Sequence, residues 1–345
     1  MNIEKSESGS AARRFRVLAL DGGGIKGTYT AAVLSSLEEM TGKRICDYFD
    51  LITGTSTGGI IAVALGLEIP AQQILQLYLE RGAEIFPVSE PGWRGRVKGG
   101  WKHLWAPKHS QSVLKAAVDS VVGQKQFGES KSRLVIPAFD AVRGRIQLFK
   151  TAHSAEYKQD YLRSAATVAL GTSAAPTYYP AYSDASGGCY LDGGVWANSP
   201  VMVGLLEATC ILGHVIDHVD LLSIGTTCSP FDISRGRRSG GVASWNVGLV
   251  ELLMEAQADA ALGQARLLTK NRMLRVDSVA RAGRFSLDNS QEIDDLRSLG
   301  QQSAREHEGA ISRQFLTTQV DAFQPFYAVR GTAPELPDTT DGAAA

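Results

Sequence analysis

The sequence predicts an α/β fold with a mostly parallel central sheet, because a strand, a glycine-rich turn and a helix follow one another twice near its start. The first unit begins with the apolar run Phe15–Leu20, passes through four glycines in residues 21–27, and enters a helix expected over residues 28–40. The second unit ends its apolar run at Gly54, turns at Ser56 and continues as an alanine-rich helix. A chain of 345 residues can form one large α/β domain or two smaller ones.

Further elements follow along most of the remaining chain. Apolar runs predict strands over residues 45–52, 133–139, 145–151, 189–191, 218–226 and 272–277. Helical spacing predicts helices over residues 69–82, 111–122, 161–170 and 290–315, a helix starting near residue 200, and a long helix around residues 249–260. The segment 171–176, which superficially resembles a second serine turn, is interpreted as a tight packing site between helix and loop.

The composition limits the class of protein and the kinds of partner that the chain can have. Hydrophobic residues make up 44% and charged residues 21%, as in ordinary globular proteins. The formal net charge of −1 gives no long-range attraction to nucleic acid or anionic lipid. Four widely spaced cysteines indicate free thiols in a reducing compartment. With neither a membrane-spanning run nor a signal-peptide core, the sequence predicts a cytoplasmic protein without a nucleic-acid partner.

The segment 54–58 reads GTSTG and fits the G-x-S-x-G pattern of a nucleophile elbow. Gly54 and Gly58 would let strand and helix approach closely around a strained Ser56. The helix that follows the turn would point its free N–H groups toward a developing oxyanion. The alternative is an inert glycine-rich turn with a capping hydroxyl group.

A second glycine-rich turn, Gly22 to Gly27, fits G-x-G-x-x-G between a strand and a helix. This is also the position of a dinucleotide-binding fingerprint. The preceding Asp21 and the serine turn that follows argue for an oxyanion hole instead, in which glycine amides face negative charge. Lys26 could add a positive charge there.

A hydrolytic serine needs a base, and the sequence favours Asp192 for this role. Asp192 follows a short strand and precedes Gly193 and Gly194, so small residues would expose its carboxylate in a cleft, with Asn198 fixing the loop by side-chain hydrogen bonds. The late histidines are predicted at helix ends, a strand start or a charged helix rather than on a presenting loop: His214, His218 and His307. We therefore expect a Ser56–Asp192 dyad, in which a weak carboxylate base relies on a preformed oxyanion hole.

The motifs DGGGIKG, GTSTGG and DGG, in this order within residues 21–194, resemble the patatin-like phospholipase family. The resemblance extends to about residue 226. It implies a three-layer α/β/α fold with extra C-terminal helices, and a Ser–Asp dyad that cleaves fatty-acyl esters of phospholipids without a metal. The family's nucleophile falls on Ser56, its base on Asp192 and its oxyanion groups on Gly22, Gly23, Gly24 and Thr57; the motif glycines are Gly27, Gly54, Gly58, Gly193 and Gly194.

The resemblance also implies a division of the chain. We expect a disordered leader at residues 1–14, a patatin-like catalytic domain at residues 15–230, a helical extension at residues 231–332 packed on the same domain, and a disordered tail at residues 333–345.

The surroundings of Ser56 and residues 192–207 resemble a narrower bacterial branch. Some of its members are effectors of CBASS anti-phage defence, in which a cyclic oligonucleotide switches on membrane degradation. This implies a membrane phospholipid substrate, a cyclic dinucleotide as activator and no cofactor. It also implies action at the inner membrane surface and homo-oligomerisation on activation. Residues 87–109, which are basic and tryptophan-rich, and the basic residues 229–243 are candidates for the activator site.

Several alternatives remain open at this stage. Residues 87–109 could instead dip into a membrane interface or simply pack on the domain. The enzyme could be a soluble carboxylesterase or thioesterase without nucleotide control. The chain could also be a nucleotide-binding module using Gly22 to Gly27, or a silent regulator that kept the fold.

Overall fold

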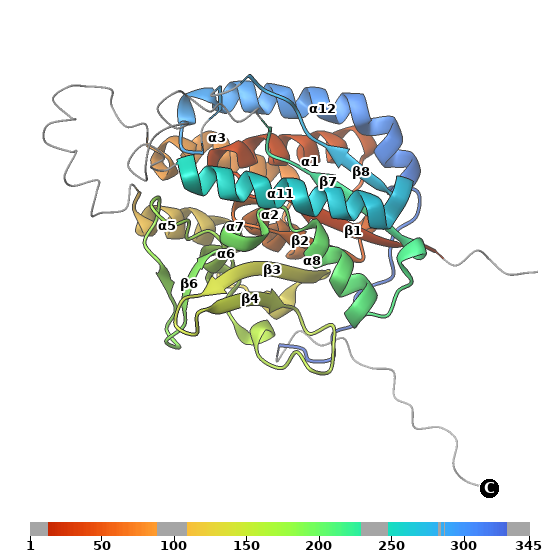
Figure 1. Ribbon diagram of the computed structural model, residues 1–345, viewed down its shortest axis with the longest axis horizontal. Coiled ribbons are helices and arrows are strands. Elements are labelled where there is room, and N and C mark those ends of the chain that lie inside the picture. Colours follow the sequence, from red (N-terminus) through yellow and green to blue (C-terminus); the bar gives the residue numbers. More distant parts are fainter. Residues whose placement is uncertain (1–12, 88–108, 229–247, 282–283, 286, 330–345) are drawn as a thin grey trace, which may run out of the picture.

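In the computed structural model, eight strands among the described residues form one mixed sheet between two layers of helices (Figure 1). The structure describes residues 13–87, 109–228, 248–281, 284–285 and 287–329. The strand order is β5-β6-β3-β2-β1-β7-β8, and β4 pairs with β3. The strands are β1 (Phe15–Leu20), β2 (Leu51–Gly54), β3 (Arg133–Asp140), β4 (Arg145–Lys150), β5 (Tyr182–Ser183), β6 (Cys189–Asp192), β7 (Val219–Ile224) and β8 (Met273–Val276).

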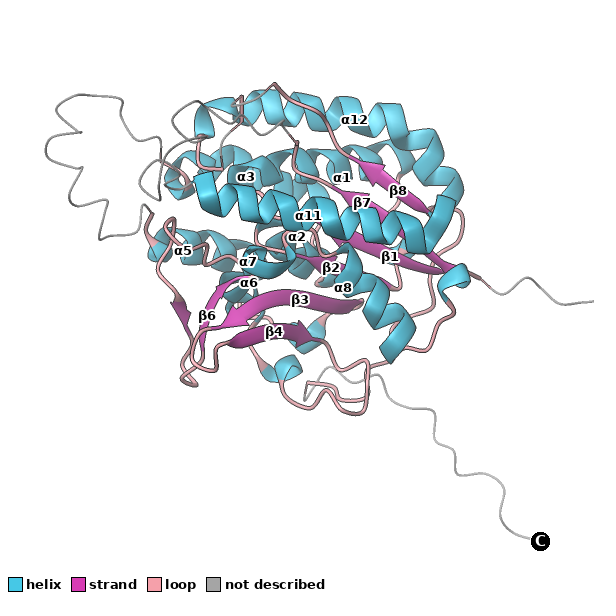
Figure 2. Ribbon diagram, in the orientation of Figure 1, coloured by secondary structure: helices cyan, strands magenta, loops and turns pink. Residues whose placement is uncertain are grey.

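The helices pack on both faces of this sheet (Figure 2). They are α1 (Gly27–Thr41), α2 (Thr57–Gly66), α3 (Ala71–Ile85), α5 (Gln111–Val122), α6 (Ala165–Thr172), α7 (Gly194–Ala197), α8 (Val201–Leu206), α11 (Gly248–Thr269) and α12 (Ile293–Gln314). One apolar core joins the sheet to α1, α2, α3, α5, α6 and α12, and a second joins it to α7, α8 and α11. The expected three-layer α/β/α fold is confirmed.

Strand β1 lies at the centre of the parallel part of the sheet. It pairs in parallel with β2 on one side and with β7 on the other, and all six of its residues are buried. Continuous burial is what a parallel strand covered on both faces requires. Leu18 and Leu20 belong to one core, whereas Val17 and Ala19 belong to the other, because successive side chains alternate between the two faces.

The sheet brings the functional motifs to one edge. Leu20 is in register with Gly54 of β2 and with Ile224 of β7, so the turns that follow these strands emerge side by side. Strand β6 runs antiparallel to β3 and pairs Asp192 with Ala138, near the carboxyl end of β3. Ligands in open α/β sheets bind beyond the carboxyl ends of the strands, and the candidate residues gather at that edge.

Several elements differ from the expected ones. Of the expected strand over residues 45–52, Ile45–Tyr48 forms a 3-10 helix, and the strand itself covers Leu51–Gly54. The helix expected over residues 161–170 begins at Ala165, because Asp160–Leu162 forms a separate 3-10 turn. Arg13 and Arg14, at the end of the expected leader, form ion pairs with Asp50 (2.7 Å) and Asp220 (2.8 Å).

Three expectations fall on parts of the chain outside the described residues. They concern residues 1–12 of the leader, the tail expected at residues 333–345, and the activator site, whose candidate segments 87–109 and 229–243 are described only at residues 87 and 109. Among the helices that the structure describes, none combines the length and the apolar character needed to cross a bilayer.

We expect Gly300→Ala to destabilise the fold, because α12 packs tightly against α1 at this point. A Cβ at residue 300 would lie 2.5 Å from the Tyr29 carbonyl oxygen and 2.8 Å from the Ala32 Cβ. Overpacking of this kind costs about 1–3 kcal/mol, measurable by urea unfolding.

Gly309→Ala on the same helix is the matched control, because the nearest neighbour of a Cβ at residue 309 would be the Arg313 guanidinium at 3.3 Å. Helix propensity should make that change neutral or stabilising by up to about 1 kcal/mol. Equal effects of the two changes would contradict this account.

Candidate active site

Ser56 occupies a strained turn between β2 and α2. Its φ of 54° and ψ of −123° lie in a region that side chains other than glycine rarely adopt. The turn is tight because backbone meets backbone: a Cβ at Gly54 would lie 2.1 Å from the Gly58 carbonyl oxygen, and one at Gly58 would lie 2.3 Å from the Leu20 carbonyl oxygen. Strand, strained serine and helix therefore have the geometry of a nucleophile elbow.

Two hydroxyl groups from the end of α6 hold the backbone of the elbow. The Ser56 N–H donates to Thr172 Oγ1 at 3.0 Å, and this hydroxyl donates in turn to the Pro137 carbonyl at 2.5 Å. Ser173 Oγ contacts the Ser56 carbonyl oxygen at 3.3 Å. These residues lie in the segment 171–176, which the sequence indicated only as a packing site. In the sequence, the only feature that set this segment apart was its partial match to the pattern of a serine turn.

Asp192 lies at the end of β6 with its side chain 1% exposed. The Gly194 N–H donates to Oδ1 at 2.7 Å, whereas Oδ2 accepts no hydrogen bond of normal geometry from the part of the chain that the structure describes. Burial raises the pKa of the Asp192 carboxyl to about 6, although the nearby Ser56 hydroxyl and the Gly194 amide favour the charged form. The carboxylate therefore has a free oxygen and a basicity above that of an ordinary aspartate.

Ser56 and Asp192 line the same cavity. Its other walls are mostly apolar and come from α2, α3, α5, α11 and the segment after α6. The apolar and aromatic lining residues include Ile60, Leu77, Tyr78, Ile85, Phe86, Leu114, Ala117, Val118, Tyr178, Tyr179, Val250 and Met254. A hydroxyl and a carboxylate at one side of an apolar pocket suit a substrate with a long hydrocarbon part and one reactive polar group.

The glycine-rich turn after β1 borders this cavity through Gly23 and Gly24, and Thr57 borders it from the start of α2. Among the described residues, the backbone amides of these three residues donate to no partner. The Gly22 amide differs, since it donates to the Asn198 carbonyl at 2.9 Å. Gly22 was expected among the oxyanion groups; its N–H is engaged, so the free donors are those of Gly23, Gly24 and Thr57.

Comparison with known proteins agrees with this geometry. The family model for patatin-like phospholipase matches residues 18–205. The chain belongs to the patatin-like phospholipase family. A "cGAMP-activated phospholipase" from Pseudomonas aeruginosa is 34% identical over 328 residues, covering 93% of this chain and 94% of that protein. A protein of the same description from Vibrio cholerae is 30% identical and covers 84% of this chain and 90% of its own length. This confirms the expected family, and with it a lipid acyl hydrolase.

The other expected residues of this patatin-like enzyme support the loops rather than the cavity. Asn198 packs its side chain between two turns: a Cβ at Gly22 would lie 2.4 Å from Asn198 Oδ1, and one at Gly194 would lie 3.2 Å away. Its Oδ1 accepts no hydrogen bond from the described residues, so it fixes the loop through its backbone carbonyl instead of its side chain. Lys26 donates to the Thr227 carbonyl at 3.2 Å and does not line the cavity.

The remaining motif glycines permit close contacts. A Cβ at Gly27 would lie 2.1 Å from Thr57 Oγ1, which is hydrogen-bonded to the Tyr78 hydroxyl. A Cβ at Gly193 would lie 2.4 Å from the Pro137 carbonyl oxygen. Among the described residues, no histidine lines the cavity and no group of three side chains is arranged to hold a metal ion.

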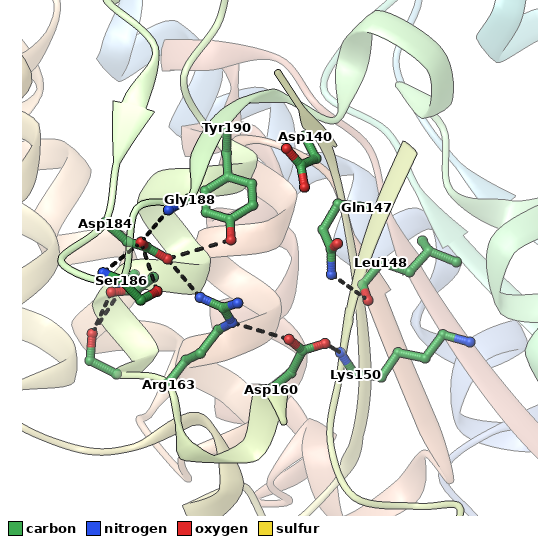
Figure 3. Close-up of polar contacts among 12 residues, drawn as sticks. Asp140, Gln147, Leu148, Lys150, Asp160, Arg163, Asp184, Ser186, Gly188 and Tyr190 are labelled. Atoms are coloured by element: carbon green, nitrogen blue, oxygen red, sulfur yellow. Dashed lines mark hydrogen bonds and ion pairs between the residues drawn. The ribbon is translucent and has the colours of Figure 1, made fainter. Parts of the chain in front are cut away.

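The hairpin that carries Asp192 in this phospholipase is anchored by Arg163 (Figure 3). Arg163 bridges Asp160 (3.1 Å) and Asp184 (2.7 Å). Asp184 also accepts from the Gly188 amide at 2.7 Å, closing the turn between β5 and β6. The guanidinium lies over the ring of Tyr190, two residues before Asp192, with its carbon 5.8 Å from the ring centroid. This network holds β6 and the turn that precedes it.

We expect Thr172→Val to slow hydrolysis while leaving the fold intact. The change keeps the side-chain shape but leaves the Ser56 N–H and the Pro137 carbonyl without their hydroxyl partner, which costs about 1–3 kcal/mol. A displaced elbow should lower kcat by about tenfold or more. Thr209→Val is the control, because among the described residues its hydroxyl contacts the Leu205 carbonyl and the neighbouring Cys210 Sγ, both on its own helix turn. A kcat equal to that of the control would contradict the role of Thr172.

Proposed function

We propose that this phospholipase cleaves fatty-acyl esters of membrane phospholipids through a Ser56–Asp192 dyad. The observation that carries the proposal is the meeting of a strained, buried serine and a buried carboxylate at one apolar cavity. The absence of a histidine from the described lining leaves Asp192 as the base within reach. Hydrogen bonds between catalytic groups are often loose without substrate and tighten in the complex, so the open Oδ2 fits this role.

The chemistry follows in two steps. Asp192 takes the Ser56 hydroxyl proton as the serine oxygen attacks the acyl carbonyl carbon, and the carbonyl oxygen becomes an oxyanion facing the amides of Gly23, Gly24 and Thr57. The intermediate collapses, and the leaving lysophospholipid alcohol takes the proton from Asp192. Water then attacks the acyl-serine as Asp192 takes its proton, the bond between the acyl carbon and Ser56 Oγ breaks to release the fatty acid, and Asp192 returns the proton to Ser56 Oγ. The apolar cavity would hold the acyl chain throughout.

We further propose that a cyclic dinucleotide switches this activity on in anti-phage defence, with oligomerisation accompanying activation. Support comes from relatives described as cGAMP-activated phospholipases, which match over most of this chain and most of their own length. The expected sites for the nucleotide, residues 88–108 and 229–243, lie outside the described residues.

The test is fatty-acid release from phosphatidylethanolamine–phosphatidylglycerol vesicles by wild type and Ser56→Ala, with and without cGAMP and other cyclic dinucleotides. We expect release by wild type only with one nucleotide, and background release from Ser56→Ala at an unchanged melting temperature. Release without nucleotide would keep the phospholipase and remove the switch. Hydrolysis of short monomeric esters alone would indicate a soluble esterase.

The raised pKa of Asp192 predicts a pH-dependent rate. The base works only when ionised, so kcat/KM should fall about tenfold per pH unit below about 6 and level off above it. The rate is measured on a short-chain ester, under activating conditions. A profile that falls near pH 4 would contradict a buried base.

The raised pKa of Asp192 also predicts that ionisation of this buried carboxyl lowers the stability of the wild-type protein. With a folded pKa of about 6 against 3.8 in the unfolded chain, wild type loses stability as pH rises from about 4 to about 6, by roughly 3 kcal/mol. Asp192→Asn lacks this loss, so it should be inactive yet melt higher than wild type at pH 8, with the difference vanishing near pH 4. Melting curves at both pH values measure it, and a less stable Asn variant at pH 8 would contradict the calculation.

A further inference from the structure

Three parallel strands end in register beside the glycine-rich turn. Leu20 of β1 pairs with Ile224 of β7, and Ile224 pairs with Val276 of β8. The residues that follow are therefore neighbours across the edge of the sheet: Asp21, Gly225 and Asp277. Asp21 is buried, and the chain passes from it through Gly22 to Gly23 and Gly24, which border the cavity. Strand β8 lies beyond residues 18–205, which the family model matches.

Arg275 of β8 reaches across β7 to Asp21. Its Nη2 lies 2.6 Å from Asp21 Oδ2 and 2.6 Å from Asp277 Oδ2, and its Nη1 donates to Ser223 Oγ at 2.7 Å. Gly225 leaves the space for this bridge, because a Cβ there would lie 2.5 Å from Nη2 and 2.3 Å from Asp277 Oδ2. One guanidinium thus joins the ends of all three strands.

The same cluster is also linked to the glycine-rich turn through the segment after β7. Asp277 Oδ1 accepts from the Thr227 N–H at 3.0 Å, which fixes the segment after β7. In that segment Thr226 Oγ1 donates to the Gly22 carbonyl at 3.1 Å, and its side chain fills the space in which a Cβ of Gly23 would stand, 2.4 Å away. Gly22, Gly23 and Gly24 have no side chains, so their position depends on contacts from their surroundings: these flanking contacts and the Lys26 N–H, which donates to the Gly23 carbonyl at 3.1 Å.

We propose that Arg275 is a positioning residue for hydrolysis: by binding Asp21 it holds the amides of Gly23 and Gly24 where the oxyanion forms. The inference rests on the proposed Ser56 chemistry. An ion pair this buried is weak evidence for a gain in stability, because desolvation offsets much of the attraction. Loss of Arg275, however, leaves Asp21 buried without its cation. The carboxyl must then take up a proton or move, and the glycines attached to it move as well.

The test compares Arg275→Met, Arg275→Lys, Asp21→Asn and the double variant Asp21→Asn/Arg275→Met in the full chain. Arg272→Met is the matched control, because Arg272 lies three residues away and forms an ion pair with Asp217 (2.8 Å) at the opposite end of β8. For each protein, kcat and KM are measured on one short-chain ester under the activating conditions, together with the melting temperature. The rate at which a fluorophosphonate modifies Ser56 gives a second readout of oxyanion stabilisation.

We expect Arg275→Met to lower kcat by about 100-fold with KM changed less than twofold, as for loss of an oxyanion donor. Lysine should restore part of kcat, because it keeps the charge but not the forked geometry. The double variant should be no slower than the slower single variant, since both changes break one interaction. Arg272→Met should keep the wild-type kcat.

Three results would overturn the positioning role. The first is a wild-type kcat in Arg275→Met. The second is a double variant in which the two single effects on kcat multiply. The third is a loss of kcat that follows the melting temperature across all variants, including the control. Asp21→Asn, which is nearly isosteric, keeps the test valid if Arg275→Met does not fold. Unchanged hydrolysis by Ser56→Ala would instead overturn the dyad itself, so the two failures are distinguishable.

Discussion

The geometry of the site depends on the contact between backbone and backbone at the elbow. Helix α2 can start at Thr57 only because Gly58 lies against the carbonyl groups of Leu20 and Asp21, with a hypothetical Cβ 2.3 and 2.6 Å from their oxygens. That contact ties the second strand–turn–helix unit to the first, and it brings the free amide of Thr57 to the same cavity as those of Gly23 and Gly24. The strained φ of Ser56 persists because both neighbouring units fix its backbone.

Electrostatics at the site follow from burial. Asp192 is buried in apolar surroundings with a single backbone donor, which raises its pKa and makes it a stronger base than an exposed aspartate. Asp21, only slightly more exposed at 4%, has a guanidinium beside it. The two carboxyl groups therefore have opposite roles in the proposed mechanism: one is left without a cation so that it can accept a proton, and the other is paired so that it stays in place.

Much of the site could be predicted from local sequence, because its residues stand in short motifs whose glycines are required by local geometry. Ser56, Asp192 and the glycine-rich turn were predicted in this way as catalytic groups, and the structure places all of them at one edge of the sheet. The engagement of the Gly22 amide by Asn198 could not be predicted, since it depends on the approach of two loops 176 residues apart in the chain. The same holds for Thr172 and Arg275, whose partners come from strands distant in sequence. At residues 45–48 an apolar run predicted a strand, whereas these residues form a 3-10 helix that buries the same apolar side chains.

The segment beyond residue 205 therefore does more than cover the catalytic core. Met254 of α11 lines the cavity and packs against Gly194, where a Cβ would lie 2.6 Å from its Cε, and Gln257 donates to the Val195 carbonyl at 3.0 Å. Strand β8 brings Arg275 to Asp21 from the other side. The turn that carries Asp192 and the turn that carries the oxyanion amides are thus each in contact with a different element of the same C-terminal segment. A rearrangement of that segment would therefore act on the proposed base through α11 and on the proposed oxyanion amides through β8.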